Sequence, residues 1–308
     1  MLVGITKMNK KSAYKILVYG HAGWIGAQFL SIASLDEDVQ CIKSNVRCDD
    51  YDALCAEIEK VKPTHLVSFI GRTHGYYNDK YFSTIDYLEQ PGRLVDNIRD
   101  NMYSPILLAF IGMQYGIHFT YLGTGCIFEY DNDHHFGSEE TGFTELSRPN
   151  FFGSSYSIVK GFTDQFMKVL AKHVLQLRIR MPIVAEEHPR NFITKILNYE
   201  KICSIPNSMS VLPDLLPIML DMIKRNRTGT YNFTNPGLIS HNEILDMYKQ
   251  ICDPDFEYQN FSVEEQNKIL DSKRSNNFLD TTKLLEEYPF LPNIKDSVRM
   301  MLSRYKKN

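Results

Sequence analysis

The sequence contains no long uninterrupted apolar run. Its longest apolar stretch, SPILLAFIGM at residues 104–113, includes a proline and a glycine and falls short of the ~20 residues that a membrane-spanning helix needs. We therefore expect no membrane partner. Residues 1–14 contain lysines but no apolar stretch followed by a small-residue cleavage site, so we interpret them as a ragged leader before the first strand.

An excess of charge of one sign is also absent. The 34 Lys and Arg residues and the 37 Asp and Glu residues are well mixed, and the net charge is −3. Nucleic-acid surfaces carry a strong basic bias, which this chain lacks. We therefore expect no nucleic-acid partner.

Paired cysteine motifs are missing as well. The six cysteines include no Cys-x-x-Cys pair, and the chain is long and has no recognisable secretion signal. These features indicate reduced thiols and a cytoplasmic location. His134 and His135 lie beside acidic residues in DNDHH, but no recognised ligand spacing accompanies them, so we expect no metal site.

Strand-like and helix-like segments alternate over the first half of the chain. Short apolar runs occur at 15–19, 39–42, 65–70, 117–123 and 174–181, and helical spacing occurs at 24–35, 51–61, about 91–115 and 154–173. Strands separated by helices predict parallel crossovers and a doubly wound α/β sheet. We assign residues 15–182 to this sheet domain.

After Pro182 the pattern loosens, with short helices, loops and frequent prolines. Residues 241–251 form a clear helical pattern, for which Ser240 is a plausible N-cap. We expect residues 183–308 to form mainly a smaller substrate-binding lobe, which completes a cleft over the carboxyl edge of the sheet.

A glycine loop joins the first expected strand to the first expected helix. In GHAGWIG, Gly20, Gly23 and Gly26 surround the helix start at Trp24 and Ile25. Glycines in a strand-turn-helix context permit a tight turn and let backbone N–H groups approach a pyrophosphate. This context predicts a Rossmann-type dinucleotide site, with simple strand termination as the alternative.

The end of the second expected strand bears on the choice of dinucleotide. An NAD site usually has an acidic residue there, but this chain has Lys43 and Arg47. Cations at this place suit a 2′-phosphate, so we predict NADPH, with NADH as the alternative. The other interpretation is that both cations are solvated. Further along, Asp49 or Asp50 is a candidate to contact the adenine ring.

Tyr156 and Lys160 are four residues apart and would share one face of a helix. A nearby ammonium group favours the phenolate and would lower the pKa of the tyrosine. Such a pair can exchange a proton with a substrate oxygen while a hydride moves. Thr124 supplies a hydroxyl at the end of an intervening strand, so these three residues predict a reductase site.

These motifs resemble those of the extended short-chain dehydrogenases/reductases. More narrowly, the nucleotide-rhamnose synthases are similar to this chain at GHAGWIG, TGCIFEYD, PRNFITKI, IPNSM and NFTNPGLISHNEIL, between about Lys15 and Lys249. The resemblance implies a bifunctional 3,5-epimerase/4-keto-reductase that converts UDP-4-keto-6-deoxy-D-glucose to UDP-L-rhamnose. It also implies an upstream 4,6-dehydratase as pathway partner, and a homodimer that pairs through the helices before and at Tyr156.

Epimerisation at C3 and C5 of a 4-keto sugar needs a base on one face of the ring and an acid on the other. Cys126 lies two residues after Thr124 and is a credible acid/base, as the matching cysteine of fucose-type relatives implies. A small buried apolar thiol is the alternative. The resemblance favours Lys195 as the second group, with His188 next. A lysine base there would need a pKa lowered by a partly dry pocket.

Further residues are candidates for the substrate. Arg72 and Thr73 follow a strand, and Asn191 matches a position that often contacts the diphosphate in extended members. Arg225 or Arg227 is a further candidate for a phosphate, with a solvated turn as the alternative. Two rival functions remain open at this point. One is a monofunctional 4-keto-reductase of a deoxysugar nucleotide, whose relatives have Tyr in place of Cys126. The other is a non-catalytic dinucleotide-sensing subunit.

Overall fold

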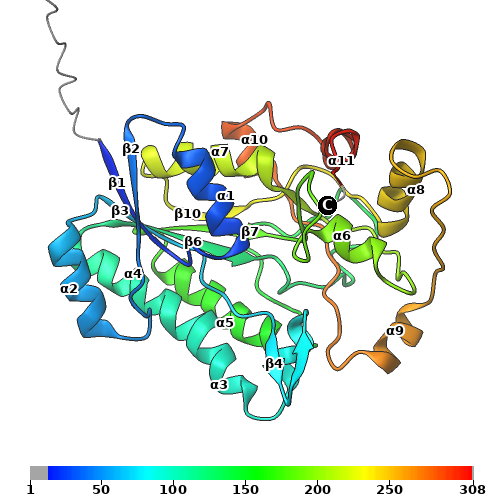
Figure 1. The fold of residues 1–308 in the computed structure, drawn as a ribbon, viewed down its shortest axis with the longest axis horizontal. Helices are drawn as coiled ribbons and strands as arrows, with labels where there is room; N and C mark the ends of the chain where they lie inside the picture. Colours follow the sequence, from blue (N-terminus) through cyan, green and yellow to red (C-terminus); the bar gives the residue numbers. More distant parts are fainter. Residues whose placement is uncertain (1–12, 307–308) are drawn as a thin grey trace, which may run out of the picture.

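The computed structural model describes residues 13–306, so almost all of the leader expected at residues 1–14 lies outside the described residues. Its centre is a six-stranded parallel sheet in the order β10-β7-β6-β3-β1-β2 (Figure 1). The strands are β1 (Tyr14–Tyr19), β2 (Val39–Lys43), β3 (His65–Ser68), β6 (His118–Thr124), β7 (Val174–Ile179) and β10 (Gly229–Asn232). The strand order reverses between β1 and β3, and ligands of such sheets bind outside that point.

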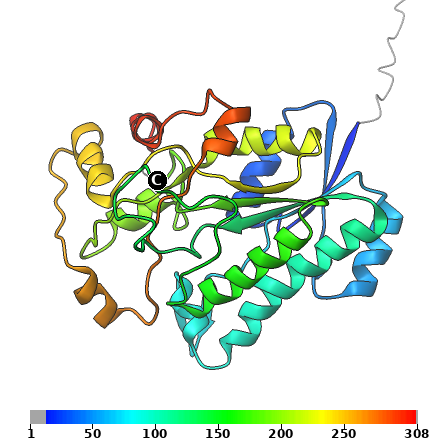
Figure 2. The same cartoon turned by 180° about the vertical axis from the view of Figure 1, so that it is seen from behind.

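Helices cover both faces of the sheet, which confirms the doubly wound fold (Figures 1 and 2). One layer contains α1 (Trp24–Ala33), α7 (Leu212–Lys224) and α10 (Thr282–Glu287), and the other contains α2 (Tyr51–Val61), α3 (Arg93–Ile98), α4 (Ser104–Tyr115) and α5 (Ser155–Val169). Successive residues of β1 alternate between the layers, because strand side chains alternate in direction. Ile16 and Val18 pack toward α1 and α7, whereas Leu17 and Tyr19 pack toward α2 and α4.

A second hydrophobic core lies beyond the carboxyl edge of the sheet. All of its buried members fall between Ile183 and Leu302. They come from β8 (Pro182–Ile183), α6 (Phe192–Leu197), β9 (Ser210–Val211), α8 (His241–Ile251) and α11 (Ile294–Ser303), and from the turns between these elements. Helix α9 (Val263–Ile269) adds no buried residue. This core supports a separate lobe in the second half of the chain.

The division at residue 182 nevertheless needs a correction, because the two halves of the chain interleave. Strand β10 pairs with β7, and α7 and α10 pack on the main sheet. The sequence analysis did not predict β10, since GTYN is too short to show a strand pattern. Residues 183–308 therefore build the second lobe and also complete the first domain.

Most expected elements occur within two residues of their predicted bounds. Ser240 caps α8 in a full capping box with Glu243, as its spacing predicted. The long helix expected over about 91–115 is interrupted by a π-helical segment, η2 (Arg99–Tyr103), between α3 and α4. A hairpin of β4 (Gly75–Tyr77) and β5 (Lys80–Phe82), followed by the 3-10 turn η1 (Ile85–Glu89), precedes it. Within residues 13–306, every helix is too short or too polar to cross a membrane.

Candidate active site

The glycine loop lies at the carboxyl end of β1, where the strand order reverses. Gly20 has φ +74°, and a Cβ there would lie 2.9 Å from the carbonyl carbon of Phe69. A Cβ on Gly26 would lie 2.4 Å from the carbonyl oxygen of Gly20. The Gly23 N–H donates to that same oxygen at 3.0 Å, and Gly23 is the N-cap of α1. Side chains at Gly20 and Gly26 would therefore disrupt the turn that opens the helix N-terminus.

A cavity of about 310 Å³ opens beside this loop. Its lining comes from the ends of β1, β2 and β3 and from the start of α4, and includes Gly20, Gly23, Arg47, Asp49, Arg72 and Asp100. A tight, side-chain-free turn at a helix N-terminus fits a dinucleotide pyrophosphate. Gly20, Gly23, Arg47 and Asp49, all predicted for the cofactor, thus meet at one cavity. Trp24 and Ile25 form the first turn of α1.

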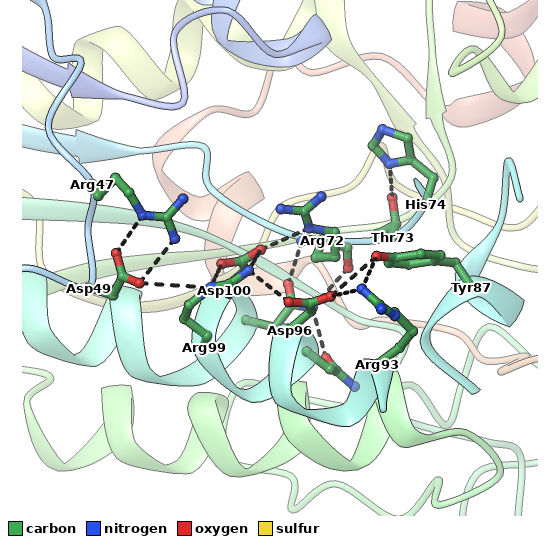
Figure 3. Close-up of polar contacts among 12 residues, drawn as sticks. Arg47, Asp49, Arg72, Thr73, His74, Tyr87, Arg93, Asp96, Arg99 and Asp100 are labelled. Atoms are coloured by element: carbon green, nitrogen blue, oxygen red, sulfur yellow. Dashed lines mark hydrogen bonds and ion pairs between the residues drawn. The ribbon is translucent and has the colours of Figure 1, made fainter. Parts of the chain in front are cut away.

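The two cations predicted to select NADPH differ in their surroundings. Lys43 is exposed at the end of β2. Arg47 is held by Asp49 in a two-point ion pair, with Nε–Oδ1 and Nη2–Oδ2 distances of 3.0 Å (Figure 3). Asp49 therefore orients Arg47 at the cavity rim. Asp50 is instead the N-cap of α2 and accepts from the Ala53 N–H, which accounts for its place in the sequence.

A row of ion pairs continues from Arg47 along the start of the α3–α4 helical segment (Figure 3). Arg99 pairs with Asp100 at 2.8 Å and Asp96 at 3.0 Å, and its Nε lies 3.9 Å from Asp49. Arg72 donates to Asp100 at 2.8 Å. This row fixes Arg72 on the cavity wall, where the sequence placed a substrate ligand.

Asn101, in the π-helical segment η2, is a residue that sequence reasoning missed. Its side chain is fully buried and bonds both sides of the Arg72 backbone: it accepts from the N–H at 2.9 Å and donates to the C=O at 2.8 Å. The wider π turn directs Asn101 at the loop after β3. Hydrophobic periodicity cannot reveal a one-residue π insertion, so the sequence carried no signal for it.

The three reductase candidates meet at the carboxyl end of β6. Thr124 is the last residue of that strand, Tyr156 lies in the first turn of α5, and all three side chains are buried. Burial raises the pKa of Tyr156, a thiolate at Cys126 would raise it further, and a hydrogen bond with Thr124 acts in the opposite direction. Burial lowers the pKa of Lys160 to about 8.

The predicted effect of Lys160 on Tyr156 was wrong in direction. The sequence predicted a lowered pKa for the phenol, but burial raises it, and Lys160 is not among the groups that shift it. The Lys160 Nζ instead donates to the hydroxyl of Tyr121 at 2.5 Å, and it lies 4.8 Å from the centre of that ring. Tyr121, buried on β6, is thus a second residue that sequence reasoning missed, because nothing in its local pattern separates it from a core tyrosine.

Cys126 lies in the turn after β6 and is half-buried. Its N–H donates to the Thr124 hydroxyl at 3.1 Å, so the two predicted groups are linked directly. Its side chain packs against a small apolar cluster that contains Tyr87, Leu88 and Tyr156. The thiol therefore lies beside the reductase tyrosine.

Of the two candidates for the second epimerisation group, Lys195 is the one near the thiol. Its pKa is lowered to about 8 by burial and by the charges of Arg190 and Arg274, whereas a thiolate at Cys126 would raise it. His188 instead stacks on Trp24, with ring centres 5.1 Å apart and planes 6° apart. Its Nδ1 accepts from the Arg190 N–H at 3.0 Å. The lysine therefore fits the predicted role better.

Arg190 connects the second lobe to the loop after β3. Its Nη1 donates to the Thr73 hydroxyl at 3.3 Å, and its Nη2 lies against the ring of His74. Burial lowers the pKa of His74 to about 4, with further contributions from Arg190, Arg72 and Lys195. Thr73 therefore faces a cluster of cations across the two lobes, as suits a phosphorylated substrate.

Asn191 does not lie free for a diphosphate. It is fully buried at the N-cap of α6, and both of its amide hydrogens are used by carbonyl oxygens, those of Val184 at 3.0 Å and Glu186 at 2.7 Å. Its Oδ1 accepts from the Ile193 N–H. The structure therefore gives Asn191 a structural role at the start of the helix that carries Lys195.

Arg225 was predicted as a substrate ligand, and this prediction was wrong. It ends α7, which runs back toward the amino edge of the parallel sheet before β10 begins. In the same turn, Asn226 bonds His65 at 3.2 Å and the carbonyl of Arg227 accepts from His118 at 2.6 Å. Both histidines begin strands, so the turn lies at the edge opposite Thr124.

Within residues 13–306, no three His, Cys, Asp or Glu side chains group as metal ligands would. His134 is engaged elsewhere, since it bonds Asp131 at 2.8 Å and stacks on Phe143.

Comparisons with known proteins place these features in context. No family model matches the chain. A protein of Acanthamoeba polyphaga mimivirus is 52% identical over 95% of this chain and 99% of its own length. The crystal structure of a UDP-rhamnose synthase from that virus is also 52% identical to this chain. It superimposes with a TM-score of 0.90 and covers 94% of this chain and 99% of its own. An Arabidopsis thaliana bifunctional dTDP-4-dehydrorhamnose 3,5-epimerase/reductase is 44% identical over 94% of this chain and 93% of its own.

More distant similarities extend the comparison. A trifunctional Arabidopsis thaliana enzyme, named for UDP-glucose 4,6-dehydratase, 3,5-epimerase and reductase activities, is 42% identical over 94% of this chain but only 42% of its own length. A dTDP-4-dehydrorhamnose reductase of Clostridium acetobutylicum is 18% identical, covers 94% of this chain and 98% of its own, and has a TM-score of 0.76. At that identity the likeness concerns the fold.

Proposed function

The chain belongs to the nucleotide-rhamnose synthases, a group of extended short-chain dehydrogenases/reductases, and we propose that it converts UDP-4-keto-6-deoxy-D-glucose to UDP-L-rhamnose by 3,5-epimerisation and 4-keto reduction. The observation that carries this proposal is the meeting of Cys126 and Lys195 with Thr124, Tyr156 and Lys160. A plain reductase needs only the last three. The UDP form is supported by the 52% identity to the viral UDP-rhamnose synthase.

The epimerisation half begins from the acidity of C3–H and C5–H beside the C4 ketone. Lys195, with its pKa lowered to about 8, holds a usable fraction of neutral amine and removes the proton from one face of the ring. The Thr124 and Tyr156 hydroxyls stabilise the enolate oxygen by hydrogen bonding. Cys126 then delivers a proton to the same carbon from the opposite face, which inverts it.

The reduction half uses the same hydroxyls at C4. NADPH, when bound, supplies a hydride to that carbon. Tyr156 is protonated at neutral pH because burial raises its pKa, and it donates a proton to the oxygen that becomes the C4 hydroxyl. Lys160, held by Tyr121, places a positive charge behind that proton transfer.

NADPH is the cofactor we propose, with Arg47 and Lys43 near the 2′-phosphate and the glycine loop at the pyrophosphate. The exposed guanidinium of Arg47, oriented by Asp49, supports this choice.

A 4,6-dehydratase activity must supply the 4-keto substrate, because C4 is already oxidised and C6 already deoxygenated when the sugar arrives. The six free cysteines support a cytoplasmic location.

A homodimer is the assembly that we propose. The helices α3, α4 and α5 lie on one face of the sheet (Figure 2). They and the segment η2 carry exposed apolar side chains, here called the α4–α5 face. It consists of Leu94, Val95, Ile98, Tyr103, Phe110, Met113, Phe162, Phe166 and Val169. Large apolar patches of this kind mark interaction sites. A second copy of the chain, pairing these helices with its own, is the occupant we expect.

Product analysis by NMR tests the proposed function. The protein is incubated with UDP-4-keto-6-deoxy-D-glucose and NADPH, and UDP-L-rhamnose is the expected product, with slower conversion when NADH replaces NADPH. Reduction only of a sugar that has already been epimerised would support the monofunctional reductase instead. A protein that binds NADPH without oxidising it in either case would fit the sensing subunit.

A further inference from the structure

Arg180, the residue after β7, is a buried arginine whose hydrogen bonds include none to a carboxylate. It is 1% exposed, and its guanidinium donates only to neutral oxygens: Gly125 O at 3.3 Å, Ser275 Oγ at 3.1 Å, Ser275 O at 3.0 Å and Asn207 Oδ1 at 2.7 Å. Arg178, two residues earlier, is equally buried but pairs with the carboxylate of Asp164 at 2.7 Å. The two arginines therefore differ in how their charge is balanced.

An unbalanced buried charge is costly, because desolvation opposes the charged form. Burial accordingly lowers the pKa of Arg180 below its usual value. A guanidinium nevertheless remains protonated in proteins, so the fold keeps this positive charge in place. A buried charge that is kept at this cost indicates a role that a neutral side chain could not fulfil.

The side chain of Arg180 passes directly beside the turn that carries Cys126. A Cβ on Gly125 would lie 3.0 Å from Arg180 Cγ and 3.1 Å from Cδ, and the guanidinium binds the Gly125 carbonyl. Asn277, also buried, donates to that carbonyl at 3.0 Å and to Phe128 O at 2.9 Å. The turn is therefore held from both sides, and only glycine at position 125 leaves room for the arginine.

A thiolate at Cys126 would act on four titratable or charged groups: Tyr156 and Lys160 from α5, Lys195 from α6 and Arg180 from the end of β7. The two lysines have pKa values lowered to about 8, so both lose charge as the pH rises past neutrality. Tyr156 is neutral there. Arg180 is thus the permanent cation of the four.

We propose that Arg180 is a positioning residue for epimerisation: it holds the Gly125–Cys126 turn and provides the fixed positive charge that stabilises the thiolate formed when Cys126 gives up its proton. This inference rests on the proposed function. In the step concerned, Lys195 takes a proton from carbon and the C–H electron pair moves into the enolate. The enolate carbon then takes the S–H proton, which forms a new C–H bond and leaves the thiolate. Water returns a proton to sulfur and removes one from Lys195.

The test compares Arg180→Met, which keeps the length of the side chain without its charge, with Arg180→Lys, which keeps a positive charge only below the lowered pKa of a buried lysine. The first measurement is the pH dependence of Cys126 alkylation by iodoacetamide, followed by peptide mapping, with half-buried Cys55 as the internal control. In Arg180→Met the midpoint for Cys126 should move to higher pH by about one unit or more, a tenfold loss of thiolate. The midpoint for Cys55 should stay near that of the wild type. The midpoint for Cys126 should rise less in Arg180→Lys than in Arg180→Met, because a buried ammonium keeps its charge only at the lower pH values.

The second measurement separates the two half-reactions. In heavy water without NADPH, Arg180→Met should incorporate deuterium into the 4-keto sugar at least about tenfold more slowly, in line with its thiolate loss. NADPH oxidation with UDP-4-keto-L-rhamnose, which needs no epimerisation, should fall much less. An unchanged alkylation midpoint in Arg180→Met, an equal shift in Arg180→Lys, or an equal loss of both half-reactions would overturn the proposal.

A second variant covers the case in which Arg180→Met does not fold. Asn207→Asp brings a carboxylate against Arg180 Nη2, which now lies 2.7 Å from the Asn207 oxygen, and so neutralises the charge while the arginine stays. The Cys126 midpoint should again rise, and no rise would reject the role of the charge. Absence of deuterium exchange in the wild type would instead reject the proposed epimerase function, and the alkylation profiles would still test Arg180.

Discussion

At the scale of the residue, burial sets the charge of each group that the proposed chemistry uses. It keeps Tyr156 protonated and able to donate. It brings Lys195 to a pKa of about 8, so that about a tenth of the lysine is neutral amine at pH 7. One environment thus supplies both an acid and a base at neutral pH, because desolvation acts in opposite directions on a phenol and an ammonium.

Substitution of Tyr156 by Phe should abolish net reduction while cofactor binding is kept. The phenol is the proposed proton donor at C4, and loss of a general acid typically lowers a rate on the order of 10²- to 10⁴-fold. NADPH oxidation with the 4-keto sugar measures the rate, and fluorescence titration measures NADPH affinity. A variant that retains most of its turnover would remove Tyr156 from the mechanism.

Cys126→Ser and Lys195→Met should separate epimerisation from hydride transfer. Serine is a much weaker acid of similar size, and methionine keeps the bulk of lysine without a base, so deuterium exchange from heavy water into C3 and C5 should be lost at one or both carbons. Wild-type exchange should rise with pH toward about 8 as the Lys195 amine forms. Both variants should still bind NADPH. Exchange at the wild-type rate in both variants would make Cys126 a packing residue.

At the scale of the element, the strand-turn-helix at Gly20–Gly26 sets how closely a pyrophosphate can approach α1. Gly26→Ala places its Cβ where only 2.4 Å separates it from the Gly20 oxygen, so the turn must move. Gly23→Ala meets the same oxygen at 3.2 Å and serves as the milder control. We expect NADPH affinity to fall at least about tenfold in Gly26→Ala, a cost of ~1.4 kcal/mol, and less in Gly23→Ala. Equal affinities in the two variants would contradict this steric reading.

The cofactor loop, the reductase trio and most helices could be predicted from the sequence, because each depends on residues near one another in the chain. The positions of Asn101 and Tyr121 could not. Asn101 depends on a π turn, and Tyr121 acquires its role only when α5 brings Lys160 beside β6. Arg225 was misplaced for the same reason: whether a residue lies at the carboxyl or the amino edge depends on the direction of a helix and on β10, which was not foreseen.

At the scale of the whole molecule, the α4–α5 face offers a test of the dimer. Phe166→Asp puts a charge on this face, at a residue that is 46% exposed. We expect the association constant of the dimer to fall at least about tenfold, which corresponds to ~1.4 kcal/mol. Light scattering after gel filtration should then show a lower mass. Leu35→Asp, at the end of α1 on the opposite layer, should leave the mass unchanged. An identical mass for Phe166→Asp and wild type would place the interface elsewhere.

Acid stability is a second property of the whole molecule. Burial lowers the pKa values of His65, His74 and His241 to about 4, below the unfolded value of about 6.5. Between these two pH values the unfolded chain binds protons that the folded chain does not. Stability should therefore be full above pH ~6.5 and fall as the pH drops toward 4.

Urea unfolding at pH 7 and pH 5 measures this loss. His65→Gln removes one of the three groups and should flatten the pH dependence, whereas His173→Gln, at an exposed position, should not. If the free energy of unfolding falls equally between pH 7 and pH 5 in His65→Gln and wild type, His65 does not cause the loss of stability in acid.

The hydrogen bonds that fix the Cys126 turn also determine when this turn can form during synthesis of the chain. Asn277 and Ser275, which fasten Gly125 and Phe128, are made about half a chain later than the residues they hold, with a separation of 152 positions between Asn277 and Gly125. By the time Lys160 has left the ribosome, the glycine loop, Thr124 and Tyr156 have all been made, and N-terminal portions of a chain generally fold first. The thiol turn must wait for Ser275 and Asn277. The hydride-transfer residues are thus made well before the thiol is placed, and any premature stop between residues 182 and 277 would leave the thiol turn without these anchors.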